Sequence, residues 1–205
     1  MNFKTYIIGL VALAAMALSG CSITGGSYST ASYNAVTDAG YTIPTIPKHK
    51  IPEQYRRQVV KFSGSEAPGT IIVDTQAKFL YYVMADGKAM RYGIGVGRDG
   101  FEWNGNARIA MKREWPTWTP PSEMIKRQPE LAKYRGGMDP GLNNPLGARA
   151  LYLFNKGGDT GYRLHGTPEW WSIGKAMSSG CIRLMNQDIM DLYDRVEVGA
   201  KVIVR

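Results

Sequence analysis

The chain has 205 residues, of which 44% are hydrophobic and 20% charged, and its formal net charge is +8. A chain of this length and composition can bury one good core, which excludes a wholly disordered or fibrous protein. Two cysteines exclude a disulfide-rich scaffold, and two histidines argue against a metal centre built from several histidines.

The first 20 residues are typical of an export signal. Lys4 precedes an uncharged apolar run over residues 6–18, which is too short to span a bilayer comfortably but suits a signal peptide. The sequence Leu18-Ser-Gly-Cys21 resembles the lipobox of bacterial lipoproteins, which implies cleavage before Cys21 and a lipid on its thiol. We therefore expect a periplasmic protein anchored in a lipid bilayer, and Ser22 weakly favours the outer membrane over the inner. The alternative is an ordinary secretory signal followed by a chance cysteine.

Residues 21–66 are expected to be the lipidated cysteine and a flexible tether. Twelve of the 26 residues in 22–47 are Ser, Thr or Gly, and none is Lys or Arg. Residues 48–66 carry five Lys or Arg against two acids, which indicates either contact with an anionic surface or simple solvated charge. His49 lies here and is expected to be an ordinary polar residue of the tether.

Strand-forming residues dominate the expected catalytic domain, residues 67–205. Runs rich in β-branched and aromatic residues predict strands at 70–74, 78–85, 88–96, 107–115, 149–154, 161–165 and 201–205. The pair Asp86-Gly87 indicates a hairpin between two of them. Helices are predicted over 122–127 and from Asn186, as the capping residue, to just before Gly199. The fold class is therefore mainly β, with sandwich or barrel-like packing and a few short helices.

Cys181 and His165 are the residues best suited to nucleophilic chemistry. If Cys21 is lipidated, Cys181 is left over in an exported protein, which suggests a reactive thiol, an intermolecular pair or an inert buried cysteine. A thiol with a pKa of about 8.5 needs a base, and a histidine with a pKa of about 6.5 can accept and return its proton. The amides of Gly180 and Cys181 could then form an oxyanion hole.

The segment His165-Gly-Thr, followed by Ser178-Ser-Gly-Cys181-Ile-Arg183, resembles the signature of L,D-transpeptidases with the YkuD catalytic domain. That signature is a histidine, an intervening stretch, and then Ser/Thr-His-Gly-Cys, a hydrophobic residue and Asn or Arg. The resemblance covers roughly residues 67–205 and implies a strand-rich YkuD-like fold. It implies that Cys181 is the nucleophile, His165 the general base and Gly180 an oxyanion-hole donor, and that the carbonyl of Gly166 orients the imidazole.

Four further residues near the signature have roles for which the sequence leaves alternatives open. Arg183 would support the site or meet a substrate carboxylate, and a structural ion pair is an equal alternative. The second histidine of the family signature is Ser179 here, which puts the rate and the acceptor preference in doubt, although its hydroxyl can donate a hydrogen bond. Trp170 and Trp171 lie between the two catalytic positions and could stack on substrate or simply pack against the sheet.

The resemblance implies acyl transfer on peptidoglycan stem peptides with no metal and no organic cofactor. Cys181 would attack the third residue of a tetrapeptide stem and release D-alanine. An amine would then take the acyl group, giving a 3–3 cross-link or an outer-membrane protein attached to the wall, and water would give a carboxypeptidase.

Other functional classes fit the sequence less well. A papain-like protease has its cysteine before its histidine, and a zinc site built on Cys181 and His165 lacks paired ligand spacing. Nucleic acid is not expected as a partner, because residues 67–205 carry 19 Lys or Arg against 14 acids in a scattered pattern. The serious non-enzyme alternative is a degenerate member in which Ser179 marks lost activity and the chain is a lipid-anchored wall-binding module.

Overall fold

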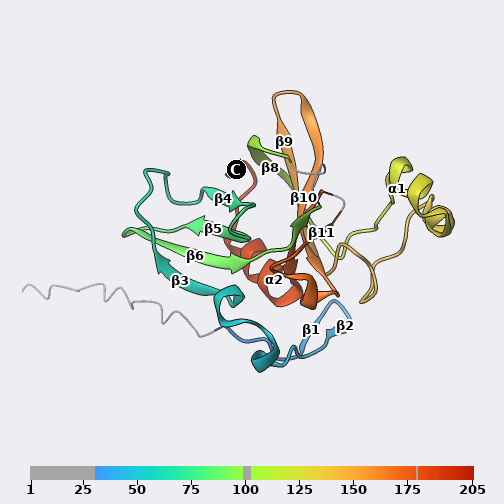
Figure 1. The fold of residues 1–205 in the computed structure, drawn as a ribbon, viewed down its shortest axis with the longest axis horizontal. Helices are drawn as coiled ribbons and strands as arrows, with labels where there is room; N and C mark the ends of the chain where they lie inside the picture. Colours follow the sequence, from blue (N-terminus) through green and yellow to red (C-terminus); the bar gives the residue numbers. More distant parts are fainter. Residues whose placement is uncertain (1–30, 99–102, 179) are drawn as a thin grey trace, which may run out of the picture.

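The computed structural model describes residues 31–98, 103–178 and 180–205 (Figure 1). The expected signal peptide, the expected lipidation site Cys21 and the signature residue Ser179 lie outside these residues. Among the helices within the described ranges, none is both long and apolar enough to cross a membrane.

Strands make up most of the regular structure, in agreement with the predicted mainly-β fold. The strands are β1 (Val36–Asp38), β2 (Tyr41–Ile43), β3 (Gln58–Lys61), β4 (Ile71–Asp74), β5 (Phe79–Val83), β6 (Lys88–Gly93), β7 (Val96–Gly97), β8 (Gly105–Glu114), β9 (Arg149–Asn155), β10 (Gly158–Thr167), β11 (Ala176–Ser178), β12 (Ile182–Met185) and β13 (Lys201–Val204). The helical segments are η1 (Lys48–Lys50), η2 (Glu53–Tyr55), α1 (Ser122–Arg127), η3 (Pro129–Tyr134), η4 (Trp170–Ser172) and α2 (Asn186–Arg195).

A large mixed sheet in the described residues has the strand order β12-β10-β9-β8-β13-β4-β5-β6-β3. The predicted hairpin joins β5 to β6, and its residues Asp86 and Gly87 both have positive φ angles, of 59° and 62°, as a tight hairpin turn requires. The sheet curls back on itself, because Gly95 after β6 and Arg183 on β12 exchange backbone hydrogen bonds of 2.9 and 2.8 Å. This bridge joins distant parts of the sheet, which explains the barrel-like packing.

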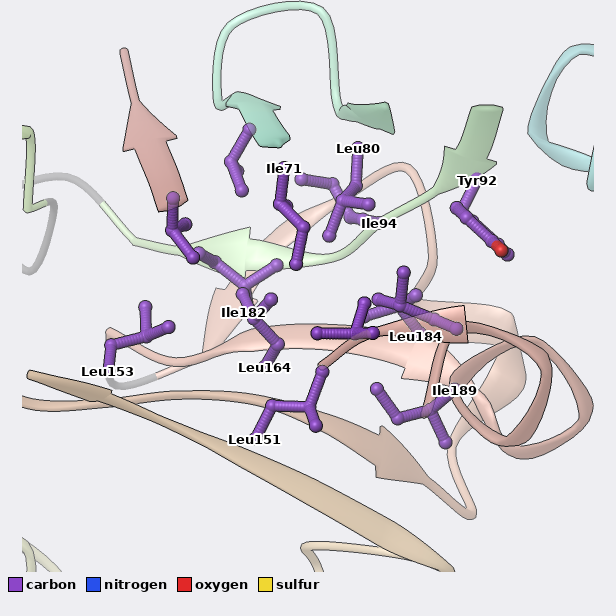
Figure 2. Close-up of a cluster of buried hydrophobic side chains, with 14 of the residues drawn as sticks. Ile71, Leu80, Tyr92, Ile94, Leu151, Leu153, Leu164, Ile182, Leu184 and Ile189 are labelled. Carbon is purple, nitrogen blue, oxygen red and sulfur yellow. The ribbon is translucent and has the colours of Figure 1, made fainter. Parts of the chain in front are cut away.

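The core fills the inside of the curled sheet and the space under α2. Figure 2 shows Leu164, Ile182 and Leu184 from β10 and β12 meeting Ile71, Leu80 and Ile94 from the other end of the sheet. Ile189 on α2 closes the cluster from below. Fully burying one such side chain contributes about 1.5–3 kcal/mol, so this cluster anchors the two strands that carry the signature residues.

The second predicted helix is confirmed as α2, but its capping prediction is wrong. Asn186 is the first helical residue, and the capping residue Met185 makes no side-chain cap hydrogen bond. The Asn186 side chain is instead used in the tertiary structure, where its Oδ1 accepts a hydrogen bond of 3.0 Å from the Ala148 amide.

The predicted flexible tether over residues 21–66 is wrong for residues 31–61. Residues 31–61, here called the N-terminal strap, include a β1–β2 hairpin, two helical turns and strand β3 at the sheet edge, and they run past α2 (Figure 1). Tyr33, Ile46 and Ile51 are at most 5% exposed and pack against Ile173 and Met185. Apolar residues scattered through a Ser/Thr/Gly-rich stretch thus form a second small core on the catalytic domain.

Candidate active site

Cys181 and His165 lie near the same end of two paired strands. Strands β10 and β12 are parallel neighbours in which Leu164 pairs with Ile182 and His165 with Arg183. Leu164 and Ile182 both point into the core, so the residues beside them point to the opposite face. Cys181 directly precedes β12 and is therefore a diagonal neighbour of His165, about 8 Å away between Cα atoms by strand geometry.

The connection between the two strands explains this proximity. After β10 the chain passes through η4 and β11. It then re-enters the large sheet as β12, next to β10. Strand β11 is itself held by parallel pairing with β7, in the register Ala176 with Val96. The signature residues, sixteen positions apart in sequence, are thereby brought to the same end of one strand pair.

The imidazole of His165 has a defined orientation and tautomer. Its Nδ1 lies 2.6 Å from the carbonyl oxygen of Gly166, and the residue is 5% exposed. A carbonyl oxygen only accepts, so Nδ1 must carry the proton and Nε2 keeps its lone pair. The expected Gly166 contact is therefore present, and it leaves His165 with a basic nitrogen for a neighbouring proton donor.

The electrostatics of the pair favour two neutral groups. Burial lowers the pKa of His165 to about 4, against a smaller opposing effect of its hydrogen bond to Gly166. Burial also raises the pKa of the Cys181 thiol, although part of the residue reaches the surface, while a hydrogen bond from the Arg163 backbone and the charges of Arg163 and Arg183 act in the opposite direction. Both shifts favour the neutral forms, a thiol at Cys181 and an uncharged imidazole at His165.

Glycines around His165 make room for the Asn186 side chain. A Cβ atom at Gly166 or at Gly147 would collide with Asn186 Oδ1, and at Gly147 it would also meet the Gly166 backbone at 2.6 Å. Gly147 has a φ of 63°, which also favours glycine. The strand end that carries the Gly166 carbonyl is thus held between Asn186 and the loop before β9.

Gly180 precedes the nucleophile candidate and is buried with a φ of 122°. Residues with a Cβ rarely adopt this conformation, so the position calls for glycine. That backbone geometry is compatible with amides aimed toward a developing oxyanion at Cys181, which stays a prediction.

Arg183 is a buried cation whose charge acts on both Cys181 and His165. Its Nη1 donates to Glu169 Oε2 at 3.1 Å, so the ion pair that the sequence left open is present. Its Nε and Nη2 atoms are buried and have no hydrogen-bond partner in the described part of the chain. Burial lowers the pKa of Arg183, with Glu169 acting in the opposite direction. Glu169 was not anticipated, because a single acid after a Gly-Thr-Pro turn has no distinctive sequence signal.

The two tryptophans differ in their surroundings. Trp170 packs on the small core formed with the N-terminal strap, whereas Trp171 is 53% exposed and meets Trp170 edge to face at 5.9 Å between ring centroids. Trp171 is thus the one whose ring is available to a ligand. No group of three or more His, Cys, Asp or Glu in the described ranges is arranged to hold a metal ion.

Comparison with known proteins shows the family of the chain. The model of the YkuD L,D-transpeptidase catalytic domain matches residues 68–204. The chain belongs to the L,D-transpeptidase family. It is 32% identical over 143 residues to the probable L,D-transpeptidase YbiS of Escherichia coli K12, which covers 65% of this chain and 43% of YbiS. The chain therefore spans less than half the length of that relative.

Two further relatives extend the likeness beyond the catalytic domain. A putative L,D-transpeptidase of Fuscovulum blasticum is 29% identical over 202 residues, covering 93% of this chain and 95% of that protein. A Brucella melitensis crystal structure, described as a probable carnitine operon oxidoreductase, is 49% identical with a TM-score of 0.53 and covers 77% of this chain and 98% of that one.

Proposed function

We propose that this member of the L,D-transpeptidase family is a periplasmic enzyme that joins peptidoglycan stem peptides to an amine through an acyl-cysteine intermediate. The observation that supports the proposal is the pairing of β10, which carries His165, with β12, which begins directly after Cys181, together with the 2.6 Å contact between His165 Nδ1 and the Gly166 carbonyl oxygen. Family membership supplies the substrate class.

In the first step the Cys181 sulfur attacks the carbonyl carbon of the third residue of a tetrapeptide stem. His165 Nε2 takes the thiol proton as the S–C bond forms, and the amides of Gly180 and Cys181 receive the negative charge on oxygen. The C–N bond to the terminal D-alanine then breaks, and the imidazolium returns its proton to the leaving amine. The products are a thioester on Cys181 and free D-alanine.

In the second step an amine attacks the thioester. His165 accepts the amine proton and delivers it to sulfur as the S–C bond breaks, which restores the neutral pair. The amine of another stem gives a 3–3 cross-link, and an amine of an outer-membrane protein would attach that protein to the wall. Water in the same position would give L,D-carboxypeptidase trimming.

The proposed location rests on the sequence of the first 21 residues. A lipid on Cys21 would hold the catalytic domain at a membrane facing the wall, and the outer membrane is the favoured one. Fractionation after labelling with a radioactive fatty acid tests this: label should follow the wild-type chain and be absent from Cys21→Ser. Soluble, unlabelled wild-type protein would contradict the anchor.

The catalytic proposal is tested with purified disaccharide-tetrapeptide as the probe. We expect release of D-alanine and a dimer linked through two third-position residues, and both should be abolished in Cys181→Ala. Formation of tripeptide without dimer would favour hydrolysis. No turnover together with binding to purified sacculi would favour the degenerate wall-binding module, the alternative raised by Ser179 in place of the family histidine.

A further inference from the structure

The N-terminal strap packs against the segment that leads to Cys181. Here the residues 169–178, which include η4 and β11, are called the site loop. Ile46 and Ile51 of the strap pack with Trp170 and Ile173 of the site loop and with Met185 at the far end of β12. The strap therefore lies behind the part of the chain that connects the two signature elements.

Tyr55, at the end of η2, is a further strap residue that contacts the site loop. Its side chain lies between Gly93, the last residue of β6, and Gly174 in the site loop. A Cβ at Gly93 would come within 2.6 Å of the Tyr55 Cβ, and a Cβ at Gly174 would overlap the Tyr55 ring. Two glycines from distant parts of the chain thus leave the space that one strap residue fills.

Gly174 is well placed to pass this contact on to the site. Its φ is 85° and its amide donates to the Ile94 carbonyl at 2.9 Å, so Tyr55 covers a fixed backbone turn. Before this turn in the sequence come Glu169, the partner of Arg183, and Trp171, whose ring is exposed. After the turn, β11 is followed in the sequence by Gly180 and Cys181.

The docking of the strap is reinforced at a second place. Tyr33 donates from its hydroxyl to Asp188 Oδ2 at 3.3 Å, and Arg57 lies 3.7 Å from Asp188 Oδ1. The Arg57 amide also donates to the Tyr33 hydroxyl at 2.7 Å. Asp188 is in the first turn of α2 and fully buried, so the strap is fastened on both flanks of Tyr55.

We propose that Tyr55 of the N-terminal strap is a positioning residue of the active site, which holds the site loop against the sheet through Gly174. The expected kinetic effects rest on the proposed function. The expected effect on the site loop, its loosening when Tyr55 is removed, does not. The inference also means that the matched family domain, which begins at residue 68, leaves out a part of the chain on which the site depends.

The test compares Tyr55→Ala with Tyr55→Phe in the full chain, purified in detergent. Acylation of Cys181 by a carbapenem is measured by intact-mass spectrometry. Alkylation by iodoacetamide is measured by peptide mapping at Cys181. Because the site loop contributes binding surface rather than the reacting atoms, Tyr55→Ala should raise the carbapenem concentration for half-maximal acylation about tenfold, with the maximal rate changed less than about threefold. Tyr55→Phe, which keeps the ring, should match the wild type in both reactions.

Hydrogen exchange provides a readout that does not need an active enzyme. In Tyr55→Ala, exchange should quicken at amides 172–178 while the core strands β9 and β10 stay protected. Thr37→Ala is the matched control, because Thr37 lies on the strap and its exposed side chain hydrogen-bonds to the Thr42 hydroxyl on the neighbouring strand rather than to the site loop. It should behave like the wild type.

Unchanged exchange at 172–178 in Tyr55→Ala overturns the inference, as does equal loosening of all strands, which would mean general destabilisation. A wild-type chain that is never acylated overturns the proposed function instead, and the exchange result still decides the role of Tyr55.

Discussion

His165 donates its Nδ1 proton to the carbonyl oxygen of Gly166, 2.6 Å away, in a position where many catalytic systems place a carboxylate or an amide. A backbone carbonyl is neutral, so it fixes the tautomer without stabilising an imidazolium by a full charge. The hydrogen bond to this carbonyl therefore raises the pKa of His165 by less than burial lowers it, and the pKa falls to about 4. The consequences can be measured.

The first prediction concerns the pH dependence of thiol reactivity. Because burial raises the pKa of Cys181, alkylation by iodoacetamide should be slow at neutral pH and should rise beyond pH 8.5. Because the pKa of His165 is lowered, His165 stays a competent base down to about pH 4, so acylation should show no acidic limb near pH 6.5. Glutathione serves as the solution reference for alkylation. A fast alkylation rate that is constant between pH 5 and 7 would instead indicate a thiolate–imidazolium pair.

The second prediction concerns Gly166→Ala. The added Cβ would collide with Asn186 Oδ1 and approach Ile189 Cγ2 to 3.0 Å, so the strand end must shift. Overpacking of this kind costs about 1–3 kcal/mol, and the shift moves the carbonyl that orients His165. We expect a lower Tm by thermal denaturation and an acylation rate reduced by about two orders of magnitude. Gly157→Ala, in the exposed turn after β9, is the control and should be acylated normally. Wild-type acylation in Gly166→Ala would show that this carbonyl does not matter.

The third prediction concerns a buried ion pair made by the N-terminal strap. Asp38 Oδ2 accepts from Arg149 Nη1 at 2.8 Å and from Trp115 Nε1 at 2.7 Å, and Arg149 is 5% exposed. Asp38→Ala leaves a buried cation without this partner and should lower the free energy of unfolding by about 3 kcal/mol in urea denaturation. Glu123→Ala removes an exposed pair with Lys126 and should cost less than about 1 kcal/mol. Equal losses of unfolding free energy in Asp38→Ala and Glu123→Ala would mean that the strap is not docked.

The fourth prediction concerns Asp188 and the pH dependence of stability. Burial raises the pKa of Asp188 to about 7, against the opposing charge of Arg57. The folded state then binds more protons than the unfolded state between about pH 4 and 7, so this group's contribution falls as pH rises through that window, by up to about 4 kcal/mol. Buried His165 acts in the opposite sense between about pH 4 and 6.5, because its folded pKa is the lower one.

The difference between Asp188→Asn and the wild type isolates this effect. Measured by urea denaturation, the wild type should lose stability relative to the variant as pH rises from 4 to 7. Asp159→Asn is the control, because Arg163 lowers the pKa of that exposed carboxyl and moves its window below pH 4. A constant difference between Asp188→Asn and the wild type would mean that Asp188 stays charged throughout.

The sequence predicted the strands that carry the site because their signals are local. The runs around β4, β5, β8 and β9 contain enough β-branched and aromatic residues to indicate strands without knowledge of their partners. The spacing of His165 and Cys181 within a known signature likewise needs no tertiary information. What the sequence could not supply was the register of β10 and β12, which brings the start of β12 alongside Leu164 and His165.

The N-terminal strap was missed because its stability is entirely tertiary. Strands β1 and β2 have three residues each, too few to show a periodicity, and their Ser, Thr and Gly neighbours resemble a linker. Ile46 and Ile51 become buried only because Ile173 and Met185 lie opposite them. Asn186 was misjudged for the same reason, since its side chain serves Ala148 rather than its own helix.

The central claim, that Cys181 acts as a nucleophile with His165 as its base, is tested most directly by intact mass. The full chain in detergent is incubated with a carbapenem, whose strained lactam carbonyl acylates an activated thiol, in parallel with Cys181→Ala and His165→Gln. The account predicts one added carbapenem mass in the wild type, none in the cysteine variant, and an adduct that forms at least about 100-fold more slowly in the histidine variant. A folded wild-type chain that gains no mass, or a histidine variant acylated as fast as the wild type, would contradict it.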